Sequence, residues 1–344
     1  MSELLDFKCP NCGGQLEFDS ETQQLKCPYC DGLFDPETFN GNSSYEIKND
    51  MFEDGELNVY LCHSCGGTIM ADQNTAASSC PYCGNPVAMS GNLSGAYKPK
   101  KILPFKLDKE AAKKNYLRHI SGKTLLPKAF SSQATIDEIK GIYVPFWIFD
   151  GTAQANMWYD ATKSRSWSDS DYYYTETQYY ELYRSGRVTF QDVPVDASSK
   201  LDDTLMQSIE PYDSKDMVDF NKNYLAGYLA DKYDVEAETC AETARKRIMN
   251  STASLFSSTT AGYETAVARS SNIQLTNGQQ EYVMLPVWLL NVNYQGQKYT
   301  FAMNGQTGKF IGDLPADSGK LVKIVITTFI IVTAVLSAVQ YFMM

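Results

Sequence analysis

The sequence predicts an α+β multidomain protein, with two N-terminal four-cysteine modules, a central α+β domain of two helix-plus-hairpin modules, and one C-terminal transmembrane helix. Three observations support this prediction. Eight of the nine cysteines lie in four CxxC pairs, the middle of the chain mixes apolar strand-like runs with charged helical segments, and the chain ends in a long uncharged run. We expect boundaries at 1–48 (ribbon one), 49–92 (ribbon two), 93–318 (the body) and 319–344 (the anchor).

The four CxxC pairs form two copies of one pattern, offset by 53 residues. Two CxxC pairs can place four thiolates tetrahedrally around one ion, the usual arrangement of a closed structural zinc site. Proline after the first cysteine in three pairs, and glycine after the second in three, favour tight turns. We therefore expect two zinc ribbons, each holding one structural Zn²⁺ with its own four ligands. Sharing of ligands between the halves is the alternative. The ligands are Cys9, Cys12, Cys27, Cys30, Cys62, Cys65, Cys80 and Cys83.

Other uses of these cysteines fit less well. Disulfides need an oxidising compartment, and the first residues, MSELLDFKCPNC, have neither the basic nor the apolar region of a signal peptide. A redox CxxC normally follows a strand in a βαβ unit, which the pattern lacks. His63 could compete as a ligand, but four cysteines already complete the site, so we expect His63 to be exposed.

The charge of the ribbons bears on their partners. Residues 1–100 hold fourteen acidic and five basic side chains, and the whole chain has a formal net charge of −11. Affinity for nucleic acid depends on clustered Lys and Arg at phosphates. We therefore expect no nucleic-acid binding, and we interpret the ribbons as protein-binding modules.

The C-terminal run, 324–342, contains 19 residues without a charge. As a helix it would be about 28 Å long, close to the thickness of a bilayer core. Lys309, Lys320 and Lys323 precede it and no charged residue follows. The positive-inside rule then places the N-terminal bulk in the cytoplasm, so we expect a tail-anchored, single-pass cell-membrane protein. A buried core helix is the alternative.

The body shows a weak internal echo, because Pro145-Phe146-Trp147 and Pro286-Val287-Trp288 each follow an apolar run. Asn304-Gly305 favours a type I′ turn, and residues 157–195 alternate tyrosine with polar residues, as in an antiparallel hairpin. In chain order we expect a hairpin at 14–27, a linker at 41–52, a linker at 91–100, strand 102–107, a helix from Asp108, strand 141–159, helices at 201–211, 215–233 and 233–256, and strands within 282–312.

The body offers no catalytic residue that the pattern supports. Gly122-Lys123-Thr124 resembles the end of a P-loop, but Leu117 stands where the loop needs glycine. We expect His119 on the surface and Cys240 buried on a helix. Tyr172–Tyr174 could stack on bases, but a sheet face or a protein contact fits better without a basic groove. No small-molecule cofactor is predicted.

The order of these parts resembles a bacterial family of double zinc-ribbon (TFIIB-type ribbon-like), C-terminally membrane-anchored proteins. The resemblance covers essentially the whole chain, and rests on the cysteines of 9–83, SIEPYD (208–213), YLAGYLADKYDV (224–235), LPVWLL (285–290) and FAMNGQTGKFIGDLP (301–315). It implies an association with SPFH/flotillin-like and phage-shock-type coiled-coil proteins, and a role as a membrane recruiter in envelope stress. Labels such as transcription-factor-type ribbon or primosomal helicase rest on the ribbon alone, and this sequence has no helicase core.

The sequence therefore favours a non-enzymatic adaptor that recruits a cytosolic partner to the membrane. Two alternatives remain open. One is a membrane-tethered, nucleic-acid-linked regulator, which would bind in a salt-sensitive way. The other is an enzyme with a site in the body, which would need a cleft with perturbed acids.

Overall fold

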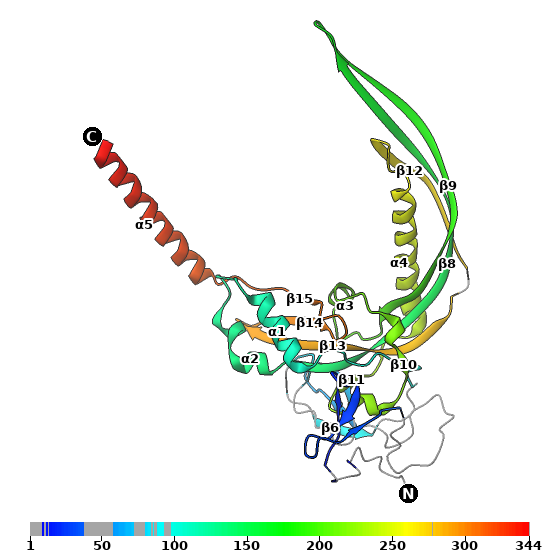
Figure 1. The fold of residues 1–344 in the computed structure, drawn as a ribbon, viewed down its shortest axis with the longest axis vertical. Helices are drawn as coiled ribbons and strands as arrows, with labels where there is room; N and C mark the ends of the chain where they lie inside the picture. The colour runs from blue at the N-terminus through cyan, green and yellow to red at the C-terminus, as the bar shows by residue number, and fades with distance from the viewer. Residues whose placement is uncertain are drawn as a thin grey trace.

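The computed structural model describes residues 9, 12, 14–37, 58–71, 80–83, 85, 88–92, 98–276 and 278–343. The expected linker at 41–52 and part of the one at 91–100 lie outside these residues. The architecture is α+β, with the ribbons at one end and α5 (Ser318–Met343) leaving the body elsewhere (Figure 1). The helices are α1 (Lys109–Ile120), α2 (Gln133–Asp137), α3 (Asp203–Ser208), α4 (Ala237–Ser258) and α5, with 3-10 helices η1 (Lys128–Ser131), η2 (Ser214–Asp216) and η3 (Lys222–Leu225).

Ribbon one contains the predicted hairpin. Strands β1 (Glu17–Asp19) and β2 (Gln24–Lys26) pair antiparallel, and β3 (Leu33–Phe34) adds to β2. Leu25 is fully buried and Phe18 nearly so, because alternate residues of a strand point to one face. This small sheet therefore has its own apolar side.

Twelve strands of the described residues form one further sheet that runs from ribbon two into the body. Ribbon two supplies β4 (Asn58–Leu61), β5 (Thr68–Ala71) and β6 (Ala88–Asn92), and β5 pairs antiparallel with β11 of the body. Ribbon two is thus joined to the body by backbone hydrogen bonds. The remaining strands are β7 (Lys101–Ile102), β8 (Lys140–Ser168), β9 (Tyr173–Asp196), β10 (Val218–Asp219), β11 (Leu229–Asp231), β12 (Thr265–Thr276), β13 (Gln280–Tyr294), β14 (Gln297–Asn304) and β15 (Phe310–Gly312).

Strand β8 is much longer than the predicted 141–159 and organises the body. Its first part pairs antiparallel with β13, its second part with β12, and β9 follows its other edge out to the tip. The expected aromatic hairpin is this β8–β9 arm, which curves away from the body with α4 on its concave side (Figure 1). Ile248 and Phe256 of α4 pack against the arm, with Ile248 beside Gly151 and the Phe256 ring beside Gly186.

The internal echo has a physical counterpart. Trp147 of β8 donates its indole N–H to the carbonyl of Val235, and Trp288 of β13 donates to the carbonyl of Leu107, each at 3.0 Å. Val235 and Leu107 lie two residues before α4 and α1, respectively. Each tryptophan therefore fixes the entry to the helix of the other half, while the two strands pair side by side.

Some element predictions are wrong. The expected helix at 215–233 is η2, β10, η3 and β11 instead, because Gly227 takes a positive φ of 81° and Leu229–Asp231 pairs between β5 and β8. Of the expected strand 102–107 only Ile102 lies in a strand, β7. The residues after β7 leave the sheet, and Phe105 stacks on the ring of Tyr228 in the core. The helix from Asp108 is confirmed, with Asp108 Oδ1 accepting from the Ala111 N–H at 2.7 Å.

The turn predicted at Asn304-Gly305 is confirmed in place, because β14 ends at Asn304 and a turn leads into the antiparallel β15, with the Gly308 N–H donating to the Asn304 carbonyl at 2.9 Å. Its predicted type is wrong. A type I′ turn requires positive φ at both central residues, which Asn304 and Gly305 do not have, whereas Gln295 (52°) and Gly296 (77°), between β13 and β14, do. Asn304 is instead fully buried, and its side-chain amide donates to the carbonyls of Ile209 and Pro211. It stabilises the loop before η2.

Candidate metal centres

The first centre is built by ribbon one. The Sγ atoms of Cys9, Cys12, Cys27 and Cys30 all lie within 4.8 Å of one another. The Sγ atoms of Cys9 and Cys30 are 3.5 Å apart, and those of Cys12 and Cys27 are 3.4 Å apart. Four converging thiols suit a closed thiophilic site. This group can hold one metal ion.

The second centre repeats the first. Cys62, Cys65, Cys80 and Cys83 also lie within 4.8 Å of one another. Cys62–Cys83 is 3.5 Å and Cys65–Cys80 is 3.7 Å, so the pairing is the same as in ribbon one. The two sites are self-contained, and the alternative of shared ligands does not hold. His63, as predicted, is exposed.

The backbone around each cysteine pair explains why the thiols converge. In all four pairs the N–H of the first cysteine donates to the carbonyl five residues later, at 2.7–2.9 Å. This bond closes a tight turn that places both sulfurs on one side. The accepting carbonyls belong to Gly14, Gly32, Gly67 and Asn85.

The same turns aim backbone N–H groups at sulfur. Burial raises the pKa of the Cys27 thiol, but the N–H groups of Tyr29 and Cys30 outweigh it, and the pKa falls to about 7. In ribbon two burial likewise opposes the N–H groups of Cys65 and Ser64, and the pKa of Cys62 falls to about 7. Metal binding requires thiolates, so these donors favour the binding form.

Ribbon two is fixed to the body through its second turn. Tyr82, between Cys80 and Cys83, is 2% exposed. An added Cβ at Gly67 would lie 2.9 Å from the Tyr82 ring, so the ring lies directly on that glycine. Asn291 of β13 donates its side-chain amide to the Pro81 carbonyl. The turn that holds the metal ligands is thus also a docking contact.

Ribbon one reaches the body through other residues. The side-chain amides of Asn221 and Asn223 both donate to the Pro36 carbonyl at 2.9 Å. Phe18 meets Tyr224 edge-on, with ring centroids 5.1 Å apart. Both ribbons are therefore held against the body. No pattern in the sequence indicates these contacts, since they join segments about two hundred residues apart.

The remaining predicted residues lie apart from the metal centres. Cys240 is buried on α4, as expected, and burial raises its pKa to about 11. His119 is half-buried and so only in part the surface residue expected, because its Nε2 lies 2.9 Å from the Gly312 carbonyl oxygen and its ring packs beside Phe301 and Phe310. Tyr172–Tyr174 are exposed at the tip of the arm.

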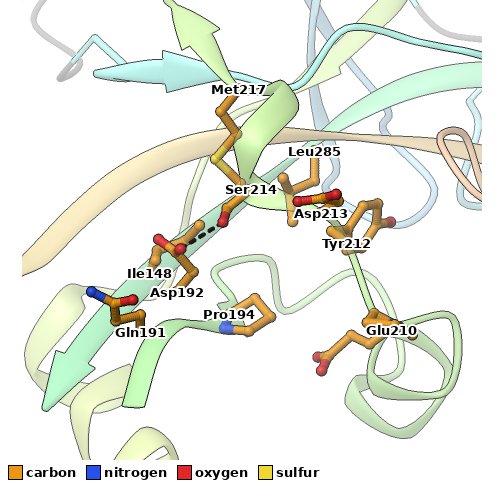
Figure 2. Close-up of a pocket in the computed structure, with 11 residues that line it drawn as sticks. Ile148, Gln191, Asp192, Pro194, Glu210, Tyr212, Asp213, Ser214, Met217 and Leu285 are labelled. Carbon is orange, nitrogen blue, oxygen red and sulfur yellow. Dashed lines mark hydrogen bonds between the residues drawn. The ribbon is translucent and has the colours of Figure 1, made fainter. Parts of the chain in front are cut away.

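Two hollows are found that sequence reasoning missed. A cavity of about 290 Å³ lies beside η2, with Ile148 and Leu285 as its apolar floor and Asp192, Glu210 and Asp213 around it (Figure 2). An open groove of about 490 Å³ runs between ribbon one and the body. The groove is lined by Glu17, Asp19, Glu21, Asp31, Asp108 and Lys26, among others.

Two buried acids, Asp196 and Asp231, have raised pKa values, but they line neither of these two hollows. Burial raises the pKa of Asp196 to about 8 and that of Asp231 to about 7. The Ser198 hydroxyl donates to Asp231 at 2.5 Å, and Tyr82 lies close to this carboxyl group. The cluster connects β11 with the second turn of ribbon two. Neither the 290 Å³ cavity nor the 490 Å³ groove therefore contains one of the two acids with a raised pKa.

Helix α5 is long and apolar enough to cross a membrane, and none of its apolar window, Ser318–Ser337, is buried. Phe329 is 70% exposed and Leu336 63%. A core helix would be covered by the rest of the protein, whereas the described residues leave this helix exposed. Its first turn is tied to the loop after α1. The Asp317 N–H donates to the Leu125 carbonyl at 2.8 Å, and Lys320 Nζ donates to the Leu126 carbonyl at 2.5 Å.

Comparisons with known proteins add one full-length relative. No family model matches the chain, and no solved structure matches it. The chain is 35% identical over 318 residues to the "Uncharacterized protein YdjG" of Bacillus subtilis (strain 168), which covers 92% of each chain. Because 318 of the 344 residues are aligned, the alignment must include part of the cysteine-rich segment 9–83 as well as the body. The chain therefore belongs to the YdjG family.

Proposed function

We propose that this protein is a membrane-anchored zinc-ribbon adaptor, which recruits a cytosolic partner to the cytoplasmic face of the cell membrane. The observation that carries the proposal is the combination of two closed four-cysteine centres with an uncovered apolar helix in one chain. Closed four-thiolate sites are structural, so their purpose is to hold a surface in shape. A membrane helix determines where that surface acts.

Zinc is the ion we assign to both centres. All-thiolate tetrahedral sites favour Zn²⁺ or iron, and the ribbon-like spacing of the pairs favours zinc. The cytoplasmic side follows from the lysines that precede the span, and it agrees with thiols kept reduced in the cytosol.

The partner class comes from the family resemblance and not from the geometry. We propose an SPFH/flotillin-like or phage-shock-type coiled-coil protein of the envelope-stress response. Acidic ribbons make nucleic acid an unsuitable partner, and the protein acts as a scaffold without catalysis of its own.

Affinity purification from gently solubilised membranes tests the adaptor function. The wild type should recover a stoichiometric protein that a Cys9→Ser/Cys62→Ser variant loses. A Cys240→Ser variant is the matched control, because this cysteine lies on α4 outside both centres. Equal recovery by the Cys9/Cys62 variant would disprove recruitment by the ribbons.

A further inference from the structure

Tyr29 and Tyr82 are equivalent residues of the two ribbons with opposite surroundings. Each follows the proline of a CPYC turn, and they are 53 residues apart, like the cysteines. Tyr82 is 2% exposed, whereas Tyr29 is 77% exposed. The duplicated turn therefore has one covered copy and one uncovered copy.

The exposed ring nevertheless lies in the same position. An added Cβ at Gly14 would lie 2.5 Å from the Tyr29 ring, just as one at Gly67 would lie 2.9 Å from the Tyr82 ring. Each tyrosine thus lies over the glycine of its partner turn. A large aromatic side chain that rests on its own ribbon and is otherwise uncovered offers apolar contact area, and tyrosine is enriched among the hot-spot residues of protein interfaces.

The covered copy shows what fits such a turn. Around Tyr82 the body supplies a pocket for the ring and an amide donor, Asn291, for the preceding proline carbonyl. A partner of ribbon one would make the equivalent contacts to Tyr29 and to the Pro28 carbonyl.

Charge identifies the kind of partner. Pro28 and Asp31, on either side of Tyr29 in the same turn, line the 490 Å³ groove between ribbon one and the body. Five carboxylates and one lysine line this groove. Asp31 is 86% exposed at its side chain and lies 3.8 Å from Lys26 Nζ, so its charge is little compensated. An acidic groove beside an aromatic anchor suits a cationic protein segment.

We propose that this groove, together with Tyr29 between Pro28 and Asp31, is the docking surface for a lysine- or arginine-rich segment of the recruited protein. The proposal rests on the recruiting function above and names the surface that performs it. Methylene stems of the bound segment would lie on Pro28 and Tyr29, while its charged ends reach Glu17, Glu21 and Asp31.

A direct binding measurement tests the groove without knowledge of the partner. Fluorescein-labelled octalysine is titrated into the full-length, zinc-loaded protein in detergent micelles at physiological salt. A Glu17→Gln/Glu21→Gln/Asp31→Asn variant should weaken binding about tenfold. A Glu176→Gln/Glu242→Gln/Glu264→Gln variant has the same change of net charge at exposed positions outside the groove, and should weaken it less than about twofold. Equal losses in the two variants, or no loss in the first, would overturn the proposal.

Affinity purification with Tyr29→Ala separates this proposal from the adaptor function. Tyr29→Ala should lose the partner while it retains both metal ions, and Tyr179→Ala, 82% exposed on β9, should retain the partner. If the partner depends on Cys9 and Cys62 but tolerates Tyr29→Ala and the groove variant, the adaptor function stands and this surface is wrong. If a second copy of this chain is what the groove variant loses, the surface is a self-association site and the proposal also fails.

Discussion

Arg247 of α4 donates two hydrogen bonds to the Glu210 carboxylate, from Nη1 to Oε1 at 3.1 Å and from Nη2 to Oε2 at 2.5 Å. The same guanidinium also donates to the Pro194 carbonyl of β9. Both side chains are largely buried, with 27% and 14% of their surface exposed. One arginine therefore joins α4, the arm and the loop that walls the cavity in Figure 2.

Arg247→Ala should destabilise the protein by about 3 kcal/mol or more, because it leaves the Glu210 carboxylate partly buried without its partner. Adding Glu210→Gln should recover part of that loss, since the unpaired charge is then removed. Thermal unfolding of the two single variants and the double variant measures this coupling. Strict additivity of the three losses would contradict it.

Metal content should follow the two centres separately. Cys9→Ser and Cys62→Ser should each lower bound zinc from two equivalents to about one, and the double variant should bind almost none, because the sites share no ligand. Mass spectrometric metal analysis of purified protein measures the ratio. Loss of both ions in either single variant would show that the centres depend on each other.

Two glycine substitutions should differ although the positions are equivalent. Gly67→Ala pushes a methyl group against the buried Tyr82 ring and should cost about 1–3 kcal/mol. Gly14→Ala meets the exposed Tyr29 ring, which can swing into solvent, so the loss should be under about 1 kcal/mol. Chemical denaturation of the two variants compares them, and a larger loss for Gly14→Ala would refute the assignment of the covered copy.

Stability should depend on pH through Asp196 and Asp231. Burial raises their pKa values to about 8 and about 7, so the folded protein keeps protons that the unfolded chain has released. The free energy of unfolding should therefore fall as pH rises from about 4 through about 8. Between about pH 6 and pH 9 the melting temperature of Asp231→Asn should fall less steeply than that of the wild type. Parallel curves would exclude the contribution of Asp231.

Removal of residues 318–344 should release the protein from the membrane. The wild type should stay in the membrane fraction after a high-salt wash, since an apolar span is held by lipid and not by charge. The truncated chain should appear in the soluble fraction with its metal centres loaded. Retention of the truncated chain on membranes would show a second lipid contact elsewhere in the body.

The metal centres could be predicted from sequence because their geometry is local. A CxxC pair and its closing hydrogen bond span six residues, so spacing alone assigned all eight cysteines to their two groups. The helix predicted at 215–233 is wrong because the conformation of this segment depends on two distant strands, β5 and β8, which flank Leu229–Asp231. The difference between Tyr29 and Tyr82 is invisible to sequence for the same reason, since it depends on what the rest of the chain places over each ring.

The attachment at the base of α5 has a mechanical consequence. The Asp317 N–H and the Lys320 side chain both hold the loop at Leu125 and Leu126, so the first turn of the helix is clamped to the body. Ribbon one is in turn clamped to the body at Pro36. With α5 in a bilayer, these two attachments would hold ribbon one at a fixed distance from the lipid headgroups. A partner bound to ribbon one would then stay at that distance, which a flexible linker would not ensure.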